Sequence, residues 1–514
     1  MLNNPLNSSA ISGDFNHRKY RPVATFNKSD RRWPDQVITK APRWCSVDLR
    51  DGNQALVEPM NPEQKLDLFK LLVEVGFKEI EVGFPAASQP DFDFVRKIIE
   101  ENLIPDDVSI QVLTQSREEL ISRSFEALTG AKKAIVHLYN STSTVQREHV
   151  FGMSRKQIKA IAVEGAVWVK QCAQQQPDTD WTFEYSPESF TGTEMEYAVE
   201  VCDAVTDIWQ PTVEKPVIIN LPSTVEMTTP NVYADQIEWV SDNIARRDCL
   251  QISLHTHNDR GCGVAAAELG LMAGADRAEG TLLGNGERTG NMDVITAAMN
   301  MYSQGIDPML DFSNMDKIIK VVNQCTNITI HPRHPYAGEL VFTAFSGSHQ
   351  DAINKCLHRR QTNDVWDVAY LPIDPADLGR SYQEVIRINS QSGKGGIAYV
   401  LEQDYGVQMP RWLQVDFSRH VQHLAEQNEG EVSSKEIWQV FRETYIGGAQ
   451  AIQLDGYQLT RQDNRDQLNA TMILENKHVA LSGNGQGALD AFVGGLTQLI
   501  GADVVITDYS EHTL

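Results

Sequence analysis

The sequence predicts an α/β fold in which a closed (β/α)₈ TIM barrel is followed by a helical region and a small α+β region. Between about residues 41 and 310, short β-branched runs alternate with stretches of helical periodicity, which is typical of parallel strands joined by crossover helices. Eight such runs are present, the number that closes a barrel of this kind. They are 44–51, 79–85, 109–115, 132–140, 181–189, 216–224, 250–259 and 277–285.

Two further regions follow the predicted barrel. Residues 311–455 have mostly helical patterns, interrupted by a glycine-rich segment at 389–396 and by proline-containing turns, and we interpret them as linker subdomains. From residue 456 the pattern changes to short strands and then a helix, which predicts a βββα unit that begins to repeat before the sequence stops. Residues 1–40 are interpreted as an N-terminal extension.

Composition excludes several classes of protein. The formal net charge of −24 disfavours nucleic acid as a partner, because phosphate binding needs concentrated lysine and arginine. No apolar run reaches the roughly 18 residues that a membrane helix needs, and the N-terminus lacks the apolar core of a signal peptide. The seven cysteines are scattered without a CxxC pair, which predicts reduced thiols and a cytoplasmic location.

Polar residues gather at the carboxyl ends of the predicted strands, where the active site of a barrel enzyme lies. They include His255 and His257, whose spacing puts both rings on one face of a strand, about 7 Å apart at Cα. Asp51 and Asn291 follow the first and last strands, which become neighbours when a barrel closes. Two imidazoles, a carboxylate and an amide suit Mn²⁺, Mg²⁺ or Zn²⁺ with positions open for substrate; the alternative is a hydrogen-bonded pair of core histidines.

Arg50 precedes Asp51, so in a regular strand it faces away from the metal and forms a buried salt bridge. If the alternation breaks at the strand end, its guanidinium can instead stabilise an alkoxide or enolate oxygen. The glycine-rich segment 280–291 fits neither the P-loop nor the dinucleotide-binding pattern. It therefore carries no phosphate-binding prediction by itself.

Three strings make the sequence more specific: WCSVDLRDGNQAL (44–56), HTHNDRGCGVAAAELGLMAGADRAEGTLLGNGERTGN (255–291) and VIRINSQSGKGG (385–396). They closely resemble the long-form 2-isopropylmalate synthase family, in the acetyl-transferring branch of the DRE-TIM metallolyase superfamily. The resemblance runs from about Lys19 to the end of the chain. Asn53 stands where many superfamily members have Glu, and the long-form branch shares this Asn.

The resemblance implies roles for individual residues. Asp51, His255, His257 and Asn291 match metal-binding positions. Arg50, His137 and Thr224 match positions that hold a 2-oxo acid, and Leu113 and Ser186 match positions near its alkyl branch. Glu188, His349 and Tyr382 match positions implicated in proton transfer, with His349 as the candidate base oriented by Glu188. Without the resemblance we would favour structural roles: hydrogen-bonded strand ends for His137 and Thr224, and a surface carboxylate, a solvated histidine and a packing tyrosine for Glu188, His349 and Tyr382.

The implied reaction is a metal-dependent Claisen-type condensation of acetyl-CoA with 2-oxoisovalerate to give 2-isopropylmalate and CoA, which commits carbon to leucine. The implied cofactors are Mg²⁺, Mn²⁺ or Zn²⁺, with K⁺ as a possible activator, and the implied partner is a second copy in a homodimer with shared active sites. Open alternatives are homocitrate or citramalate synthase activity, a retro-aldol lyase and a non-catalytic metabolite sensor. Family members have a leucine-binding regulatory domain of two βββα units, so we expect weakened leucine inhibition if the second unit is incomplete.

Overall fold

The computed structural model describes residues 17–20, 26–382, 388, 394–428, 431–446, 452–474 and 477–506. The chain divides into two compact units. The first comprises residues 1–343 and 371–382, and the second comprises residues 344–370 and 383–514. Each unit is described by itself.

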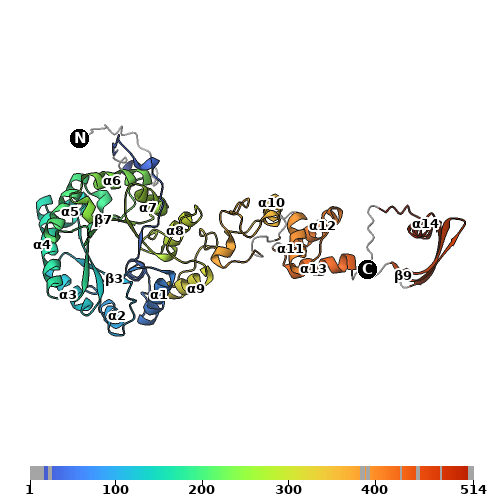
Figure 1. The fold of residues 1–514 in the computed structure, drawn as a ribbon, viewed down its shortest axis with the longest axis horizontal. Coiled ribbons are helices and arrows are strands. Elements are labelled where there is room, and N and C mark those ends of the chain that lie inside the picture. The colour runs from blue at the N-terminus through green and yellow to red at the C-terminus, as the bar shows by residue number, and fades with distance from the viewer. Residues whose placement is uncertain are drawn as a thin grey trace. The chain divides into compact units, whose positions relative to one another are not determined.

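The first unit is a closed barrel of eight parallel strands in sequence order (Figure 1). The strands are β1 (Arg43–Ser46), β2 (Glu79–Gly83), β3 (Ser109–Gln115), β4 (Lys133–Ser141), β5 (Asp180–Glu188), β6 (Val217–Ser223), β7 (Leu250–Thr256) and β8 (Arg277–Gly280). β1 pairs with both β2 and β8, which closes the sheet. The predicted barrel and its eight strands are confirmed.

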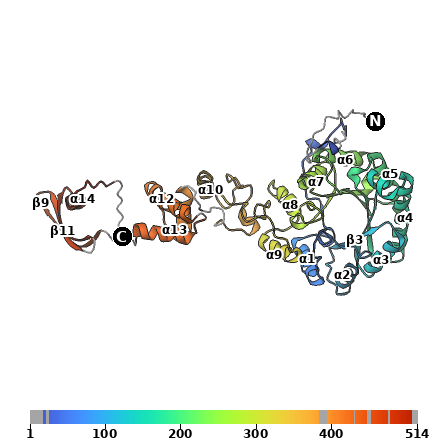
Figure 2. The same ribbon diagram turned by 180° about the vertical axis from the view of Figure 1, so that it is seen from behind.

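Helices α1 to α8 surround these strands, as both views of the ribbon show (Figures 1 and 2). Their bounds, with that of the following α9, are α1 (Pro62–Val75), α2 (Gln89–Glu100), α3 (Glu118–Leu128), α4 (Arg155–Gln174), α5 (Met195–Trp209), α6 (Pro230–Asn243), α7 (Gly263–Met272), α8 (Val294–Tyr302) and α9 (Met315–Thr326). Local sequence fixes several ends. At α1, Asn61 and Gln64 form a capping box and Gly76 ends the helix with φ 112°, a backbone angle that glycine adopts at low cost.

The two faces of the barrel strands carry different chemistry. On β7, the side chain of Leu254 packs closely against Gly270 of the helix α7. A Cβ atom added at Gly270 would lie only 2.7 Å from Leu254 Cδ1. The alternate residues Ser253 and His255 instead contact side chains of β8 inside the barrel. The outward face therefore supplies the apolar packing, and the inward face is lined by buried polar and charged groups.

β1 is shorter than the predicted run 44–51, since it ends at Ser46 and continues as a π-helical turn, η3 (Asp48–Gly52). The carbonyl of Val47 accepts hydrogen bonds from the amides of residues 50, 51 and 52 at 3.2, 2.9 and 3.1 Å. The buried Asp48 carboxylate accepts from the amide of Leu282, just beyond β8, at 3.0 and 3.1 Å. This turn, and not a strand, presents residues 50 and 51.

The second unit contains a helical part and a βββα part. The helices are α10 (Gly347–Arg359), α11 (Lys394–Tyr405), α12 (Arg411–Asn428) and α13 (Ser434–Phe441). The predicted βββα unit is β9 (Ile452–Gln462), β10 (Arg465–Leu474), β11 (Lys477–Gly485) and α14 (Ala488–Ile500), an antiparallel sheet of order β11-β10-β9. Residues 389–393 of the glycine-rich segment and 507–510 of the last predicted strand lie outside the described residues, and residues 504–506 are neither helix nor strand. The predicted domain limits at 310 and 455 stay predictions.

Candidate active site

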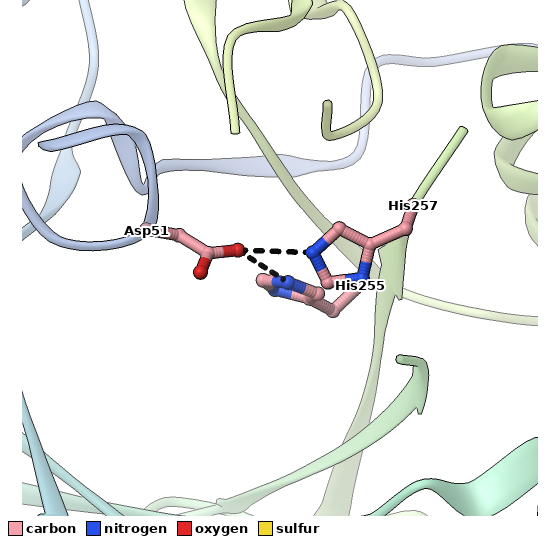
Figure 3. Close-up of side chains that lie close together, drawn as sticks. All are labelled: Asp51, His255 and His257. Carbon is pink, nitrogen blue, oxygen red and sulfur yellow. Dashed lines mark hydrogen bonds and ion pairs between the residues drawn. The ribbon is translucent and has the colours of Figure 1, made fainter. Parts of the chain in front are cut away.

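His255, His257 and Asp51 meet at the carboxyl end of the barrel (Figure 3). His255 lies on β7 and His257 just after it, while Asp51 comes from η3. The Nε2 atom of each histidine lies 3.2 Å from Asp51 Oδ2, and the potential ligand atoms of all three residues lie within 4.8 Å of one another. These buried side chains form a group that can hold a metal ion.

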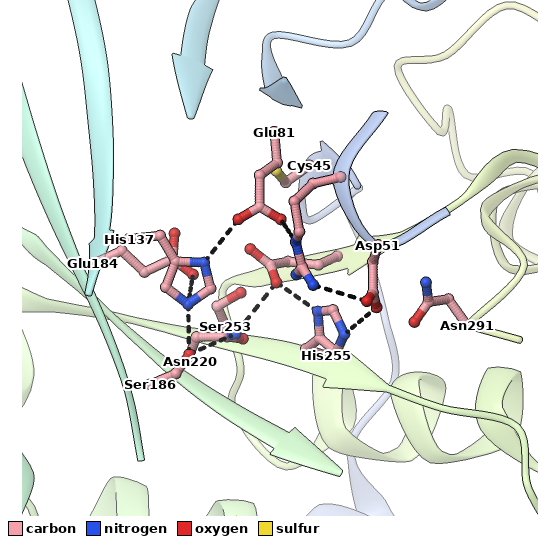
Figure 4. Close-up of polar contacts among 12 residues, drawn as sticks. Cys45, Asp51, Glu81, His137, Glu184, Ser186, Asn220, Ser253, His255 and Asn291 are labelled. Atoms are coloured by element: carbon pink, nitrogen blue, oxygen red, sulfur yellow. Dashed lines mark hydrogen bonds and ion pairs between the residues drawn. The ribbon is translucent and has the colours of Figure 1, made fainter. Parts of the chain in front are cut away.

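Asn291 comes beside this group through a tight loop after β8. Its backbone forms an isolated bridge with that of His257, and its amide donates to the carbonyl of Gly284 at 3.1 Å. The loop needs Gly290, whose φ is 102° and whose missing Cβ would lie 1.9 Å from that carbonyl oxygen. Figure 4 shows Asn291 next to Asp51.

Two buried atoms at this site have no hydrogen-bond partner among the described residues: Asn291 Oδ1 and His257 Nδ1. A buried acceptor without a partner costs about 1–3 kcal/mol, so native structures supply one. An amide oxygen beside two imidazoles and a carboxylate is a donor set that divalent cations accept. The residues present therefore fit a metal ion.

The electrostatics of the group follow from burial and pairing. Burial by itself raises the pKa of Asp51, but Arg50 and the two histidines lower it well below its usual range. Burial lowers the pKa of His255, while hydrogen bonds to Asp51 and to Glu279 raise it to about 9. Both carboxylates therefore favour positive charge at His255, whether a proton or a metal ion supplies it.

Arg50 lies in the turn η3 and not in a strand, so its side chain does not follow the strand alternation that would point it outward. Its Nη1 donates to Asp51 Oδ1 at 2.8 Å and its Nε donates to Glu81 Oε2 at 2.7 Å. Glu81 Oε1 in turn lies 3.1 Å from His137 Nδ1 (Figure 4), so one buried carboxylate contacts both the guanidinium of Arg50 and the imidazole of His137. The strand alternation does break here, because Arg50 lies in η3. Arg50 makes buried ion pairs and also lies beside the group that can hold a metal ion, so the structure contains both features that were left open.

A cavity of about 290 Å³ opens at this end of the barrel, enough for a small organic acid. Nine of the predicted site residues line it: Arg50, Asp51, Leu113, His137, Ser186, Glu188, Thr224, His255 and His257. Within it, His137 Nε2 lies 2.7 Å from Ser186 Oγ, and Thr224 Oγ1 accepts from the amide of Ser189 at 2.9 Å. The cavity thus joins polar groups to apolar walls.

Two predicted catalytic residues lie elsewhere in the chain. Tyr382 belongs to the first unit and donates from its hydroxyl to Asp374 Oδ1 at 2.7 Å; it is not among the residues that line the cavity. His349 belongs to the second unit, where its ring stacks on Tyr370 with a centroid distance of 3.9 Å. Their roles in proton transfer stay predictions.

Seven lining residues were missed by the sequence reasoning: Gln54, Phe84, Tyr139, Asn220, Pro222, Glu287 and Arg288. Most follow or end a predicted strand, as Phe84 does in EVGFP and Tyr139 does in IVHLYN. Their position alone could have indicated them, since barrel active sites use strand ends. Arg288 pairs with Asp259 at 2.6 Å, so its charge is already partly neutralised.

The chain is similar to known proteins over nearly its whole length. Residues 41–322 match the family model described as HMGL-like. A 2-isopropylmalate synthase of Alcanivorax borkumensis is 59% identical over 97% of this chain and 90% of its own length. The chain belongs to the 2-isopropylmalate synthase family. Synthases of this name from Rhodospirillum rubrum and a Parafrankia species are 58% and 56% identical, over 97% and 96% of this chain and 90% and 89% of theirs.

Membership of the 2-isopropylmalate synthase family confirms the predicted enzyme class, a condensing acyltransferase of leucine biosynthesis. Residues 339–402 match the model of the post-catalytic domain of alpha-isopropylmalate synthase. Residues 431–514 match the LeuA allosteric (dimerisation) domain, which includes the βββα unit β9–α14 and supports a homodimer. Among the described residues, no helix is both long and apolar enough to cross a membrane.

Proposed function

We propose that the cavity binds a 2-oxo acid beside a divalent metal and condenses it with acetyl-CoA, giving 2-isopropylmalate when the acceptor is 2-oxoisovalerate. The observation that carries this proposal is the convergence of Asp51, His255 and His257 beside the unpartnered Asn291 Oδ1 at the cavity. Mg²⁺ or Mn²⁺ fits this mixed nitrogen and oxygen set, as does Zn²⁺. A metal bound there would polarise the carbonyl group of the acceptor.

Arg50 stabilises negative charge on oxygen in this proposal. Its side chain is only 10% exposed, so its charge acts where water is largely excluded. Asp51 and Glu81 hold the guanidinium at two nitrogen atoms, which fixes its direction before substrate arrives. A pre-oriented cation stabilises the developing oxyanion without reorganisation during the reaction.

The walls of the cavity favour a branched, uncharged acceptor chain. Leu113, Phe84, Tyr139 and Pro222 supply apolar surface, whereas the second carboxylate of 2-oxoglutarate would need another cation. The further guanidinium in the lining, Arg288, already pairs with Asp259. Pyruvate would leave the apolar wall without contacts, so 2-oxoisovalerate is the acceptor that the lining favours.

Proton transfer is assigned to Glu188, His349 and Tyr382. A base removes a proton from the methyl group of acetyl-CoA, and the resulting carbon attacks the carbonyl carbon of the 2-oxo acid. The carbonyl oxygen then takes up a proton, and water hydrolyses the thioester to release CoA as a free thiol. Glu188 lines the cavity and accepts a hydrogen bond from the Ser141 hydroxyl, which supports a role close to the reacting atoms.

Exposed apolar side chains around the cavity support a homodimer with shared active sites. They lie in the loops after β4 and β6, at the carboxyl end of the barrel: Val145, Val150, Phe151, Met153, Val225 and Met227. Large apolar side chains exposed at one end of a barrel are a feature that protein interfaces use. The second copy is the partner that the match to a dimerisation domain supports.

The test is thiol release from acetyl-CoA, followed with a thiol reagent for 2-oxoisovalerate, 2-oxoglutarate and pyruvate, each with Mg²⁺, Mn²⁺, Zn²⁺ or a chelator. We expect the fastest release with 2-oxoisovalerate and none with the chelator. Faster release with another acceptor would contradict the substrate proposal. Release that survives the chelator would contradict the metal proposal, and cleavage of a hydroxy acid without thiol release would indicate a lyase.

A further inference from the structure

Glu279 lies on β8 and contacts the ring nitrogen of His255 opposite the one that faces Asp51, and its two carboxylate oxygens have four partners. Oε2 lies 2.7 Å from His255 Nδ1 and accepts from Asn220 Nδ2 at 3.2 Å. Oε1 accepts from Arg277 Nη1 at 2.7 Å and from Gln111 Nε2 at 3.1 Å. The residue is 1% exposed. Both oxygens of this carboxylate are therefore held by neighbouring side chains.

We propose that Glu279 is a positioning residue that fixes the tautomer and ring orientation of His255. A neutral imidazole has one N–H group, and a carboxylate at Nδ1 holds that hydrogen there. Nε2 then presents its lone pair towards Asp51, where the metal-binding atoms converge. Carboxylates that orient metal-binding histidines in this way raise metal affinity. The inference rests on the metal site of the proposed function and adds a residue to it.

Arg277 keeps Glu279 in place. Besides Glu279, its guanidinium donates to Glu79 Oε2 at 2.5 Å, to Ser253 Oγ at 2.8 Å and to Gln111 Oε1 at 2.8 Å. Gln111 therefore accepts from Arg277 and donates to Glu279, which fixes its amide as well. Arg277, Gln111 and Glu279 are all buried and hydrogen-bonded to one another. The Glu279 carboxylate is therefore fixed in position and cannot move with the His255 ring if the ring rotates.

Glu184 offers a matched control from the same barrel interior. It is fully buried like Glu279 and lies 3.5 Å from Arg277 Nη1. Its imidazole neighbour is His137, at 3.6 Å, and not His255. A substitution there disturbs the same charged cluster but leaves the contact at His255 Nδ1 untouched.

The experiment titrates the full-length protein with Mn²⁺ and follows free Mn²⁺ by electron paramagnetic resonance, comparing wild type, Glu279→Gln and Glu184→Gln. We expect Glu279→Gln to weaken Mn²⁺ binding by about 10- to 100-fold, with turnover largely restored at high Mn²⁺. Glu184→Gln should weaken binding by less than the roughly tenfold expected of a residue that orients a ligand, because its imidazole neighbour is His137 and not His255. Equal weakening in both variants, or unchanged affinity in Glu279→Gln, would overturn the proposal.

Circular dichroism shows whether each variant is folded. If Glu279→Gln does not fold, Glu279→Asp keeps the charge beside Arg277 and shortens the reach to His255. It should weaken Mn²⁺ in the same direction, and wild-type affinity in this variant would overturn the proposal. Wild type that binds no Mn²⁺, Mg²⁺ or Zn²⁺ would contradict the metal site itself, whereas normal wild-type binding with an unaffected variant contradicts only the role of Glu279.

Discussion

The barrel holds two groups of acidic and imidazole side chains with very different surroundings. Asp51, His255 and His257 form one, and His137, Glu184 and Glu279 form the other; in each, the potential ligand atoms lie within 4.8 Å of one another. The first group lines the cavity, and both histidine Nε2 atoms face one oxygen of Asp51. In the second group His137 lines the cavity, but Glu184 and Glu279 do not.

The second group also has a guanidinium, that of Arg277, between its two carboxylates. Arg277 lies 2.7 Å from Glu279 and 3.5 Å from Glu184, and these carboxylates and Glu79 raise the pKa of its guanidinium against the effect of burial. Arg50 contacts the first group only from one side, at Asp51 Oδ1. The same residue types therefore form a group that can hold a metal ion where they border the cavity, and an internal charge network where the Arg277 guanidinium lies among them.

The substitution His255→Ala is the most direct test of whether the first group holds a metal ion and the second does not. Removing one metal ligand should lower turnover about a thousand-fold, because a metal that polarises a carbonyl supplies several kcal/mol to the transition state and each 1.36 kcal/mol is tenfold. His423→Ala, at an exposed position on α12, is the control and should keep wild-type turnover. Thiol release measures both. Unchanged turnover in His255→Ala would mean that the first group is no metal site.

Arg277→Met tests the charge network of the second group. The substitution leaves buried carboxylates without their cation. It should therefore lower the free energy of unfolding by about 3–5 kcal/mol. Arg43→Met is the matched control, because Arg43 also pairs with Glu79 but its side chain is 51% exposed, and it should cost at most about 1 kcal/mol. Denaturant unfolding followed by circular dichroism compares them. Similar losses in the two variants would remove the distinction between the groups.

The substitution Leu113→Ala tests whether the apolar wall of the cavity beside the first group contacts the acceptor. Leu113 is a mostly buried part of the apolar wall, so its truncation should lower kcat/KM for 2-oxoisovalerate by about tenfold or more. A 2-oxo acid with one more methylene should lose less, because it fills the new space. Steady-state kinetics with both acceptors gives the ratio. A uniform loss for both would place Leu113 outside the acceptor site.

Glu194 shows what burial adds, since it lies nearer the surface between Arg147 and Arg155, at 2.8 and 2.7 Å. Burial raises the pKa of Glu194, but hydrogen bonds from these two arginines and the charge of Arg147 lower it to about 2. The stability that it adds is therefore fully present above about pH 4.5 and is lost as the pH falls towards 2.

Glu194→Gln should lower the unfolding free energy by about 1 kcal/mol or less at neutral pH, the usual value of such a pair. The difference from wild type should shrink below about pH 4.5. Thermal unfolding at pH 7 and pH 4 measures the change. A difference that grows on acidification would contradict the direction of the pKa shift.

Much of the fold follows from the sequence because its signals are local. The eight strands are short apolar runs, and Asp51, His255, His257 and Asn291 are ligand-type residues at strand ends. The π-helical turn η3 is different, because Asp48 depends on the amide of Leu282, which is distant in the sequence. No local pattern carries that contact.

The buried network was missed although the sequence holds a signal for it. In EIEVG, Glu79 and Glu81 alternate with apolar residues, and in RAEG, Arg277 and Glu279 alternate with Ala278 and Gly280. Alternation in a strand normally indicates a solvated face. A barrel strand has no solvated face, because helices cover one side and the other strands enclose the opposite side. Charged residues two apart in such a strand therefore predict internal ion pairs.

The bridge from Asp48 to Leu282 and the contact from Asp51 to His255 join the two ends of the barrel sequence. Asp51 and His255 are 204 positions apart, so a ribosome has made about half of the 514-residue chain when it adds His255. Contacts of such separation form late in folding, because the entropy of closing the loop is lost before they stabilise anything. An unclosed barrel cannot bring His255 to Asp51, so under the proposed function metal uptake would report that the barrel has closed.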